Sequence, residues 1–177
     1  MPSNISLGLL VLEIIRRTPV WVWAILAALI VLGLTQMRDR VIGRTRLMVM
    51  PIGLGLYSLA GAASMFGARP QVVVAWVAGL ALAVAANRVL QWPGNVRSDG
   101  RGNFAVPGSV WPLVLMMAIF ALRYVGSVSL AFHPEWAHDA VFSLGLALAY
   151  GTLSGLFTAR ALRILGSERA APVLGAA

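Results

Sequence analysis

Cysteine and lysine are both missing from this sequence, and only six residues are acidic. The lack of cysteine excludes disulfides, thiolate metal sites and thiol catalysis. All fourteen basic residues are therefore arginine, and the formal net charge is +8. Because these arginines are spread between apolar segments, without a basic face or a nucleic-acid-binding motif, no nucleic-acid partner is expected.

Common enzyme motifs are missing as well. The sequence has no P-loop, no dinucleotide-binding glycine pattern and no H-E-x-x-H motif. It also has no convincing Ser/His/Asp set or pair of carboxylates. We therefore expect a protein that is not an enzyme and that needs no cofactor.

Apolar residues, in contrast, make up 59% of the chain, and its mean hydropathy is +0.83. They occur in runs of about 20 residues, the length that spans a bilayer as a helix. The pattern predicts an all-α integral membrane protein whose transmembrane domain, residues 19–166, is followed by a flexible tail, residues 167–177. Five transmembrane helices are expected, at about residues 20–36, 47–67, 71–90, 110–132 and 139–165.

The first eighteen residues are predicted to form an interfacial amphipathic helix. Residues 1–18 are apolar for only about nine positions before Glu13, Arg16 and Arg17, too few to span a bilayer, and they show no signal-peptide cleavage pattern. Trp21 then marks the interface where the first spanning helix begins, as tryptophan commonly does.

The distribution of arginine predicts the orientation. Cytoplasmic loops of membrane proteins carry an excess of Arg and Lys. Three arginines fall on one side of the predicted helices, namely Arg16, Arg17 and Arg69. Ten fall on the other side: Arg38, Arg40, Arg44, Arg46, Arg88, Arg97, Arg101, Arg160, Arg163 and Arg169.

We therefore expect a multi-pass protein of the bacterial inner membrane, with a periplasmic N-terminus and a cytoplasmic C-terminus. A bacterial source is indicated by the use of arginine alone together with much Ala, Gly, Leu and Val, which is typical of a GC-rich genome. The loop at residues 91–109 is then cytoplasmic, and its turn-rich centre predicts a short hairpin between the third and fourth helices.

Arg123 is the remaining arginine, and it lies near the middle of the fourth predicted helix. A cation at that depth costs about 2.5 to 3.5 kcal/mol on insertion scales. Its side chain points toward the more distant membrane face, so snorkelling relieves this cost incompletely. We expect Arg123 to face the helix bundle, either as a structural residue that joins helices or as a site for an anionic solute, a lipid headgroup or a proton-coupled step. The candidate intramembrane polar site contains Arg123, Tyr124, Ser127, Tyr57, Ser58, Tyr150 and Ser154.

A second candidate cluster follows the fourth helix, in the loop "HPEWAHD". It contains His133, Glu135, His138 and Asp139, all of which can bind metals. The histidines are separated by five positions across a proline, which differs from the i, i+4 spacing of a helical metal site. We interpret the loop as an external turn in which Asp139 caps the fifth helix, and we predict no metal there.

Small residues recur at every fourth position in two of the predicted helices. Ala75, Gly79 and Ala83 form one stripe, and a second stripe contains Ala147, Gly151 and Gly155. Such stripes allow helix backbones to approach closely. They either pack on each other within one chain or form a homodimer.

In the second helix, Pro51 predicts a kink or a loosened turn.

Several short motifs are distributed along the chain. They are Thr18-Pro19-Val20-Trp21, Arg46 followed by Pro51, Pro107-Gly108-Ser109, Ala118-Ile119-Phe120 with Arg123-Tyr124, and Tyr150-Gly151 with Ser154-Gly155 through Arg160. Over about residues 10 to 165 the chain resembles a family of small bacterial inner-membrane proteins of unknown function. In that family the position of Arg123 is usually basic, and the resemblance implies a purpose for the charge without implying an activity.

These observations favour a non-catalytic membrane component that acts by self-association or by binding a partner within the lipid bilayer. The alternative is a transporter for a small solute, an ion or a lipid, with Arg123 in its intramembrane site. An intramembrane enzyme is the third hypothesis.

Overall fold

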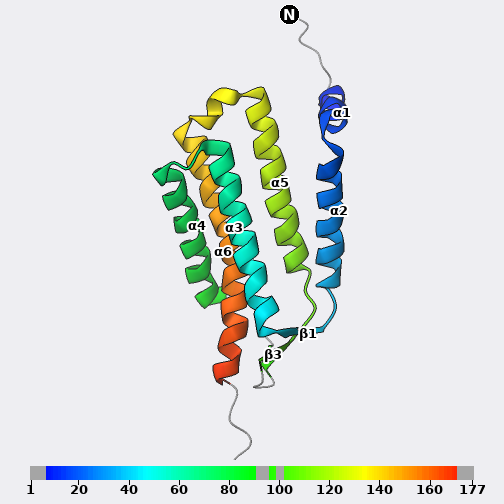
Figure 1. Cartoon of the computed structure of the whole chain (residues 1–177), viewed down its shortest axis with the longest axis vertical. Helices are drawn as coiled ribbons and strands as arrows, with labels where there is room; N and C mark the ends of the chain where they lie inside the picture. The colour runs from blue at the N-terminus through cyan, green and yellow to red at the C-terminus, as the bar shows by residue number, and fades with distance from the viewer. Residues whose placement is uncertain (1–6, 91–95, 99–101, 171–177) are drawn as a thin grey trace, which may run out of the picture.

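The computed structural model describes residues 7–90, 96–98 and 102–170, and these residues are mostly helical (Figure 1). Its α-helices are α1 (Leu7–Arg17), α2 (Val20–Thr35), α3 (Arg44–Phe66), α4 (Pro70–Leu90), α5 (Trp111–Phe132) and α6 (Ala140–Ala170). A short 3-10 turn, η1 (Pro134–Ala137), joins α5 to α6.

Four of these helices, α3 to α6, are long and apolar enough to cross a membrane. The shortest, α4, has 21 residues, which at about 1.5 Å per residue covers a hydrocarbon core of about 30 Å. The chain therefore has the structure of a multi-pass membrane protein. The remaining predicted span corresponds to α2, which is apolar but has 16 residues, about 24 Å. Its crossing of the bilayer stays a prediction.

The bundle is built around a close contact between α4 and α6 (Figure 1). A Cβ atom on Gly79 of α4 would overlap the carbonyl oxygen of Leu148, and one on Gly151 of α6 would overlap the carbonyl oxygen of Trp76. Glycine at both positions therefore allows the two backbones to touch. The two predicted stripes pack on each other within the chain. A single chain does not test the predicted homodimer, but all of the stripe residues except the half-buried Ala75 are already buried within the chain.

The other helices surround this pair. α3 packs against α6 and continues through Pro51, α5 packs against α6 more lightly, and α2 lies against α5 on the far side (Figure 1). α1 sits beyond the start of α2 and is seen nearly along its axis in Figure 1. α1 covers Leu7–Arg17 of the predicted interfacial helix, and residues 1–6 lie outside the described residues. The position of α1 at a membrane interface stays a prediction.

A small antiparallel sheet closes one end of the bundle. It contains β1 (Arg40–Gly43), β2 (Arg97–Ser98) and β3 (Asn103–Val106), in the order β1-β3-β2. β2 and β3 form the predicted hairpin. β1 was not predicted, because a four-residue strand is defined by its pairing with β3, a segment distant in sequence.

The sheet also explains why α6 is longer than predicted. Phe104 of β3 is fully buried in a cluster with Ile42, Leu47 and Ile164. This contact stabilises the last turns of α6, which continues to Ala170 instead of ending at residue 165. The residues of the predicted flexible tail are thus helical as far as 170, and residues 171–177 lie outside the described residues.

The predicted cytoplasmic and external segments lie at opposite ends of the bundle. The sheet and the C-terminal end of α6 lie at one end, and α1, the α3–α4 turn and η1 lie at the other (Figure 1). This separation is what a chain threaded repeatedly through a bilayer requires.

Candidate functional site

A cavity of about 890 Å³ lies between α1, α2, α3 and α5. This volume is within the range of about 300 to 1,000 Å³ that is usual for small-molecule sites. Its walls are mostly apolar, and the larger apolar lining residues include Trp21, Val22, Ile25, Leu29, Leu54, Met116, Ile119, Phe120, Val128 and Phe132. We call it the Arg123 cavity, because Arg123 also lines it.

The Arg123 cavity is a lateral groove. It follows α5 from Met116 to Phe132, a length of about 24 Å. Its edges are open, since Trp21 is 63% exposed, Tyr57 49% and Phe132 57%. The groove is therefore open along its side.

Arg123 supplies a cation to the part of this groove beside α3. Its Cζ atom lies 5.4 Å from the centre of the Tyr57 ring, a cation–π contact. A Cβ atom on Gly61, one helical turn after Tyr57, would overlap Nη1 of Arg123. The guanidinium group thus lies against the α3 backbone at a position where only glycine leaves room.

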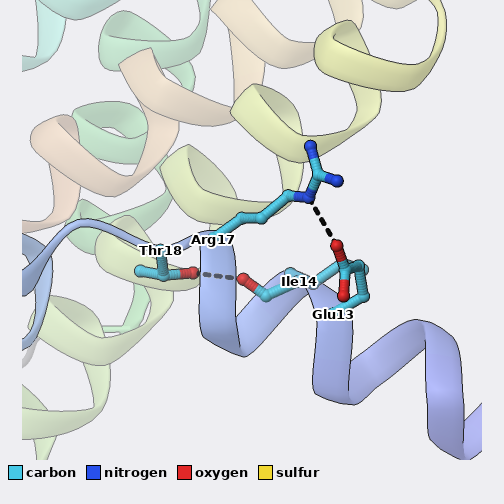
Figure 2. A network of polar contacts seen from close by, with 4 residues as sticks. All are labelled: Glu13, Ile14, Arg17 and Thr18. Atoms are coloured by element: carbon cyan, nitrogen blue, oxygen red, sulfur yellow. Dashed lines mark hydrogen bonds and ion pairs between the residues drawn. The ribbon is translucent and has the colours of Figure 1, made fainter.

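Within the described part of the chain, Arg123 makes no ion pair, and no hydrogen bond from its guanidinium group is found. Glu13 also lines the cavity, but its Oε1 is paired with Nε of Arg17 at 2.6 Å. Figure 2 shows this pair on the last turns of α1. Both side chains are exposed, so the pair contributes little to stability. Among the residues that the structure describes, Arg123 therefore contacts an aromatic ring and no carboxylate.

Tyr124 connects the groove to the N-terminal segment. The Thr18 hydroxyl donates to the carbonyl oxygen of Ile14 at 2.7 Å (Figure 2), and it lies 2.7 Å from the Tyr124 hydroxyl. Because the Thr18 hydrogen is used, Tyr124 is the donor in the second bond. The Phe120 ring stacks on Tyr124 with centroids 6.1 Å apart. These contacts hold the junction of α1 and α2 against α5 and fix that end of the cavity.

The structure brings together four of the seven predicted polar-site residues. Tyr57, Arg123, Tyr124 and Ser127 all line the Arg123 cavity. Ser127 follows Arg123 by one turn of α5, so both side chains lie on one helix face. These four residues therefore share one half-open groove.

The other three residues, Ser58, Tyr150 and Ser154, lie in the buried packing of α3, α4 and α6. The indole of Trp76 donates to the Ser58 hydroxyl at 3.0 Å, and Ser58 donates to the carbonyl oxygen of Tyr150 at 3.3 Å. The Tyr150 hydroxyl contacts the sulfur of Met65 at 3.8 Å. Ser154 is fully buried, and its hydroxyl has no partner in the described structure. None of the three lines the cavity.

The loop after α5 is an exposed turn. His133 Nδ1 lies 3.0 Å from Glu135 Oε1, and the His133 ring stacks on Trp136. A hydrogen bond from the backbone amide of Glu135, and a second with His133, lower the pKa of the Glu135 carboxyl. Asp139 accepts a hydrogen bond of 2.7 Å from the amide of the third residue of α6, which confirms that it caps this helix. His138 follows η1 directly, and no group of three metal-binding side chains gathers among the described residues.

Sequence reasoning missed Gly61 and Thr18. The signal for Gly61 was available, because it lies four residues after Tyr57 and therefore on the same face of its helix. Thr18 was noted only as part of the motif Thr18-Pro19-Val20-Trp21, and its bond with Tyr124 joins residues 106 positions apart.

Comparisons with known proteins give one match. The model of a family described as "Family of unknown function (DUF6622)" matches residues 6–173, nearly the whole chain. Neither the comparison with curated proteins nor the comparison with solved structures found a match. The match confirms the resemblance to a family of unknown function.

Proposed function

We propose a function for this chain, which belongs to the family of unknown function DUF6622, from its own geometry. It is a non-catalytic membrane protein that binds an anionic amphiphile in the Arg123 cavity. The amphiphile carries a carboxylate or phosphate at one end, which pairs with Arg123, and a hydrocarbon chain, which fills the apolar groove.

The observation that carries this proposal is that the guanidinium group of Arg123 lies in an apolar groove and makes no ion pair with any residue that the structure describes. A cation near the middle of a helix costs about 2.5 to 3.5 kcal/mol to insert. A bound anion offsets much of this cost, because charge-assisted hydrogen bonds are stronger where water is scarce. Tyr57 and Ser127 add two hydroxyls to the cavity lining.

The apolar walls favour an amphiphile over a small hydrophilic solute or ion. A hydrophilic solute would lose its hydration in the groove without gaining enough polar partners. A lipid-like chain instead gains contact with Ile25, Leu29, Leu54 and Ile119, which line the groove. It can also enter sideways from the bilayer through the open edge. Of the transport hypotheses, binding of a lipid is thus the best supported.

The same proposal includes the orientation. The sheet end carries most of the arginines that flank the helices, and it faces the cytoplasm of a bacterial cell under the positive-inside rule. α1 then lies at the periplasmic surface of the inner membrane. The Arg123 cavity then extends from that surface along about 24 Å of α5, which is most of a hydrocarbon core of about 30 Å.

Native mass spectrometry of the protein, released from its own membranes in mild detergent, tests the proposal. We expect a retained non-protein mass on the wild-type chain and its loss from Arg123→Gln. Arg88→Gln is the matched control. Arg88 is exposed at the end of α4, so this substitution removes the same charge outside the cavity. Retention of the mass by Arg123→Gln would contradict the proposal. So would a bare wild-type chain that also fails to bind an added long-chain fatty acid.

A further inference from the structure

A second pocket, of about 260 Å³, lies at the sheet end of the bundle. Three arginines line it, and each comes from a different element: Arg40 from β1, Arg46 from the first turn of α3, and Arg160 from α6. We call it the arginine pocket. No carboxylate is among the described residues that line it. Asp39, adjacent to Arg40 in sequence, instead accepts a hydrogen bond of 2.6 Å from the amide of Gly108.

Two of the three arginines are held in place. Arg160 is only 6% exposed, so packing restricts its side chain. Arg40 donates through Nη2 to Oε1 of Gln36 at 2.8 Å, and Gln36 is itself buried. Arg46 is exposed and stands at the rim. A preorganised pair reduces the entropy that is lost when a ligand binds, and the exposed Arg46 adds a third cation at the rim.

The electrostatics of this pocket favour an anion. Partial burial, and to a lesser extent the charge of Arg46, lower the pKa of Arg40. An anion bound between Arg40 and Arg46 would relieve this repulsion. α3 also begins beside this pocket, and the dipole of the helix adds positive potential at its N-terminus.

We infer that the arginine pocket binds a phosphate group, supplied by the headgroup of a phospholipid or by free phosphate. Guanidinium groups bind phosphate oxygens in pairs, and three arginines from three directions surround a tetrahedral group. The pocket is smaller than the usual range for whole ligands of about 300 to 1,000 Å³, so it holds a headgroup and not an entire lipid. Apolar residues such as Met50 and Phe157 line its other side.

This inference does not depend on the proposed ligand of the Arg123 cavity. The two sites have no lining residue in common, and along α2 they lie toward opposite ends, at Leu32 and Gln36 for the arginine pocket and from Trp21 to Leu29 for the Arg123 cavity. A variant in one pocket therefore leaves the cations of the other in place.

The test measures binding of phosphatidylglycerol and of phosphatidylcholine to the full chain by native mass spectrometry, with inorganic phosphate as the soluble competitor. Arg46→Gln is the main variant, because Arg46 is exposed and its loss leaves the core intact. Arg44→Gln is the matched control, since Arg44 lies in the same helical turn and does not line the pocket. Arg40→Gln is a second test on a different element. All are measured with Arg123 present and in the Arg123→Gln background, so that binding in the other cavity is recognised.

We expect Arg46→Gln and Arg40→Gln to weaken binding of a phosphate-bearing ligand by about tenfold, the effect of one charge-assisted hydrogen bond. Arg44→Gln leaves it unchanged, in both backgrounds. Preference for phosphatidylglycerol without competition by inorganic phosphate assigns the phosphate to a lipid. Displacement of bound lipid by millimolar inorganic phosphate assigns it to free phosphate. Equal weakening by Arg44→Gln and Arg46→Gln, or no weakening by either pocket variant, would overturn the inference.

Discussion

Replacing Gly61 by alanine is expected to move the Arg123 guanidinium group without destabilising the fold. The added Cβ atom would overlap Nη1 of Arg123 and lie 3.3 Å from its Cζ atom. Because the obstacle is the far end of a flexible side chain, we expect Arg123 to move while the backbone stays in place. The guanidinium group must shift by roughly 1 Å, which is enough to break a hydrogen bond that needs about 2.7 to 3.2 Å.

Gly61→Ala is expected to weaken ligand binding but not to lower the free energy of unfolding. Loss of a charge-assisted hydrogen bond costs about 1.5 to 3 kcal/mol, which weakens binding of an anionic amphiphile by about 10- to 150-fold. The free energy of unfolding stays equal or rises by up to about 1 kcal/mol, since alanine is a better helix former than glycine. Gly55→Ala is the matched control, because nothing lies within 4 Å of a Cβ atom at that position on the same helix.

Quenching of tryptophan fluorescence by a bromine-labelled long-chain fatty acid provides the assay. Trp21 lines the Arg123 cavity, so a bound brominated chain lies close to its ring. The Trp21→Phe variant identifies the part of the signal that comes from the cavity. Gly61→Ala with wild-type affinity, or Gly55→Ala with equally reduced affinity, would refute the assigned position of Arg123.

Three further predictions concern the frame around the cavity. Gly151→Leu is expected to destabilise the protein by about 1 to 3 kcal/mol or more through overpacking at α4, whereas Gly145→Leu, with no atom near a Cβ position, changes little in thermal unfolding. Tyr124→Phe removes the bond to Thr18, costs about 0.5 to 1.5 kcal/mol, and increases hydrogen exchange at the α1–α2 junction; unchanged exchange there would contradict the role of this bond. Asp139→Ala removes the cap of α6 and lowers the free energy of unfolding by about 1 kcal/mol, while Asp139→Asn retains most of the stability.

The spanning helices were predictable because their signal is local. An apolar run of about 20 residues identifies a spanning helix without knowledge of its neighbours. The β2–β3 hairpin followed from the turn residues between its strands, and the cap at Asp139 from its place before α6. β1 was not predictable in this way, since its pairing with Phe104 and the rest of β3 joins distant parts of the chain.

The candidate site was predictable in part for a similar reason. Arg123 was predicted to face the helix bundle, because a cation in the middle of the membrane costs free energy. Its surroundings, however, depend on which face each helix presents. Tyr57 and Ser58 are adjacent in sequence and point about 100° apart around α3, so only Tyr57 lines the cavity while Ser58 binds Trp76. The depth of a residue in the membrane therefore does not predict which of two neighbouring residues lines the cavity.

The central claim is that Arg123 recognises the negative charge of an amphiphile. Its most direct test compares the affinities of a long-chain carboxylate, an alkyl phosphate and an alcohol of equal chain length, for wild type and for Arg123→Gln. We expect the wild-type protein to prefer at least one of the two anions over the alcohol by about tenfold or more, and Arg123→Gln to bind all three with the affinity of the alcohol. A wild-type protein that does not distinguish the anions from the alcohol, or an Arg123→Gln variant that keeps the preference, would contradict the claim.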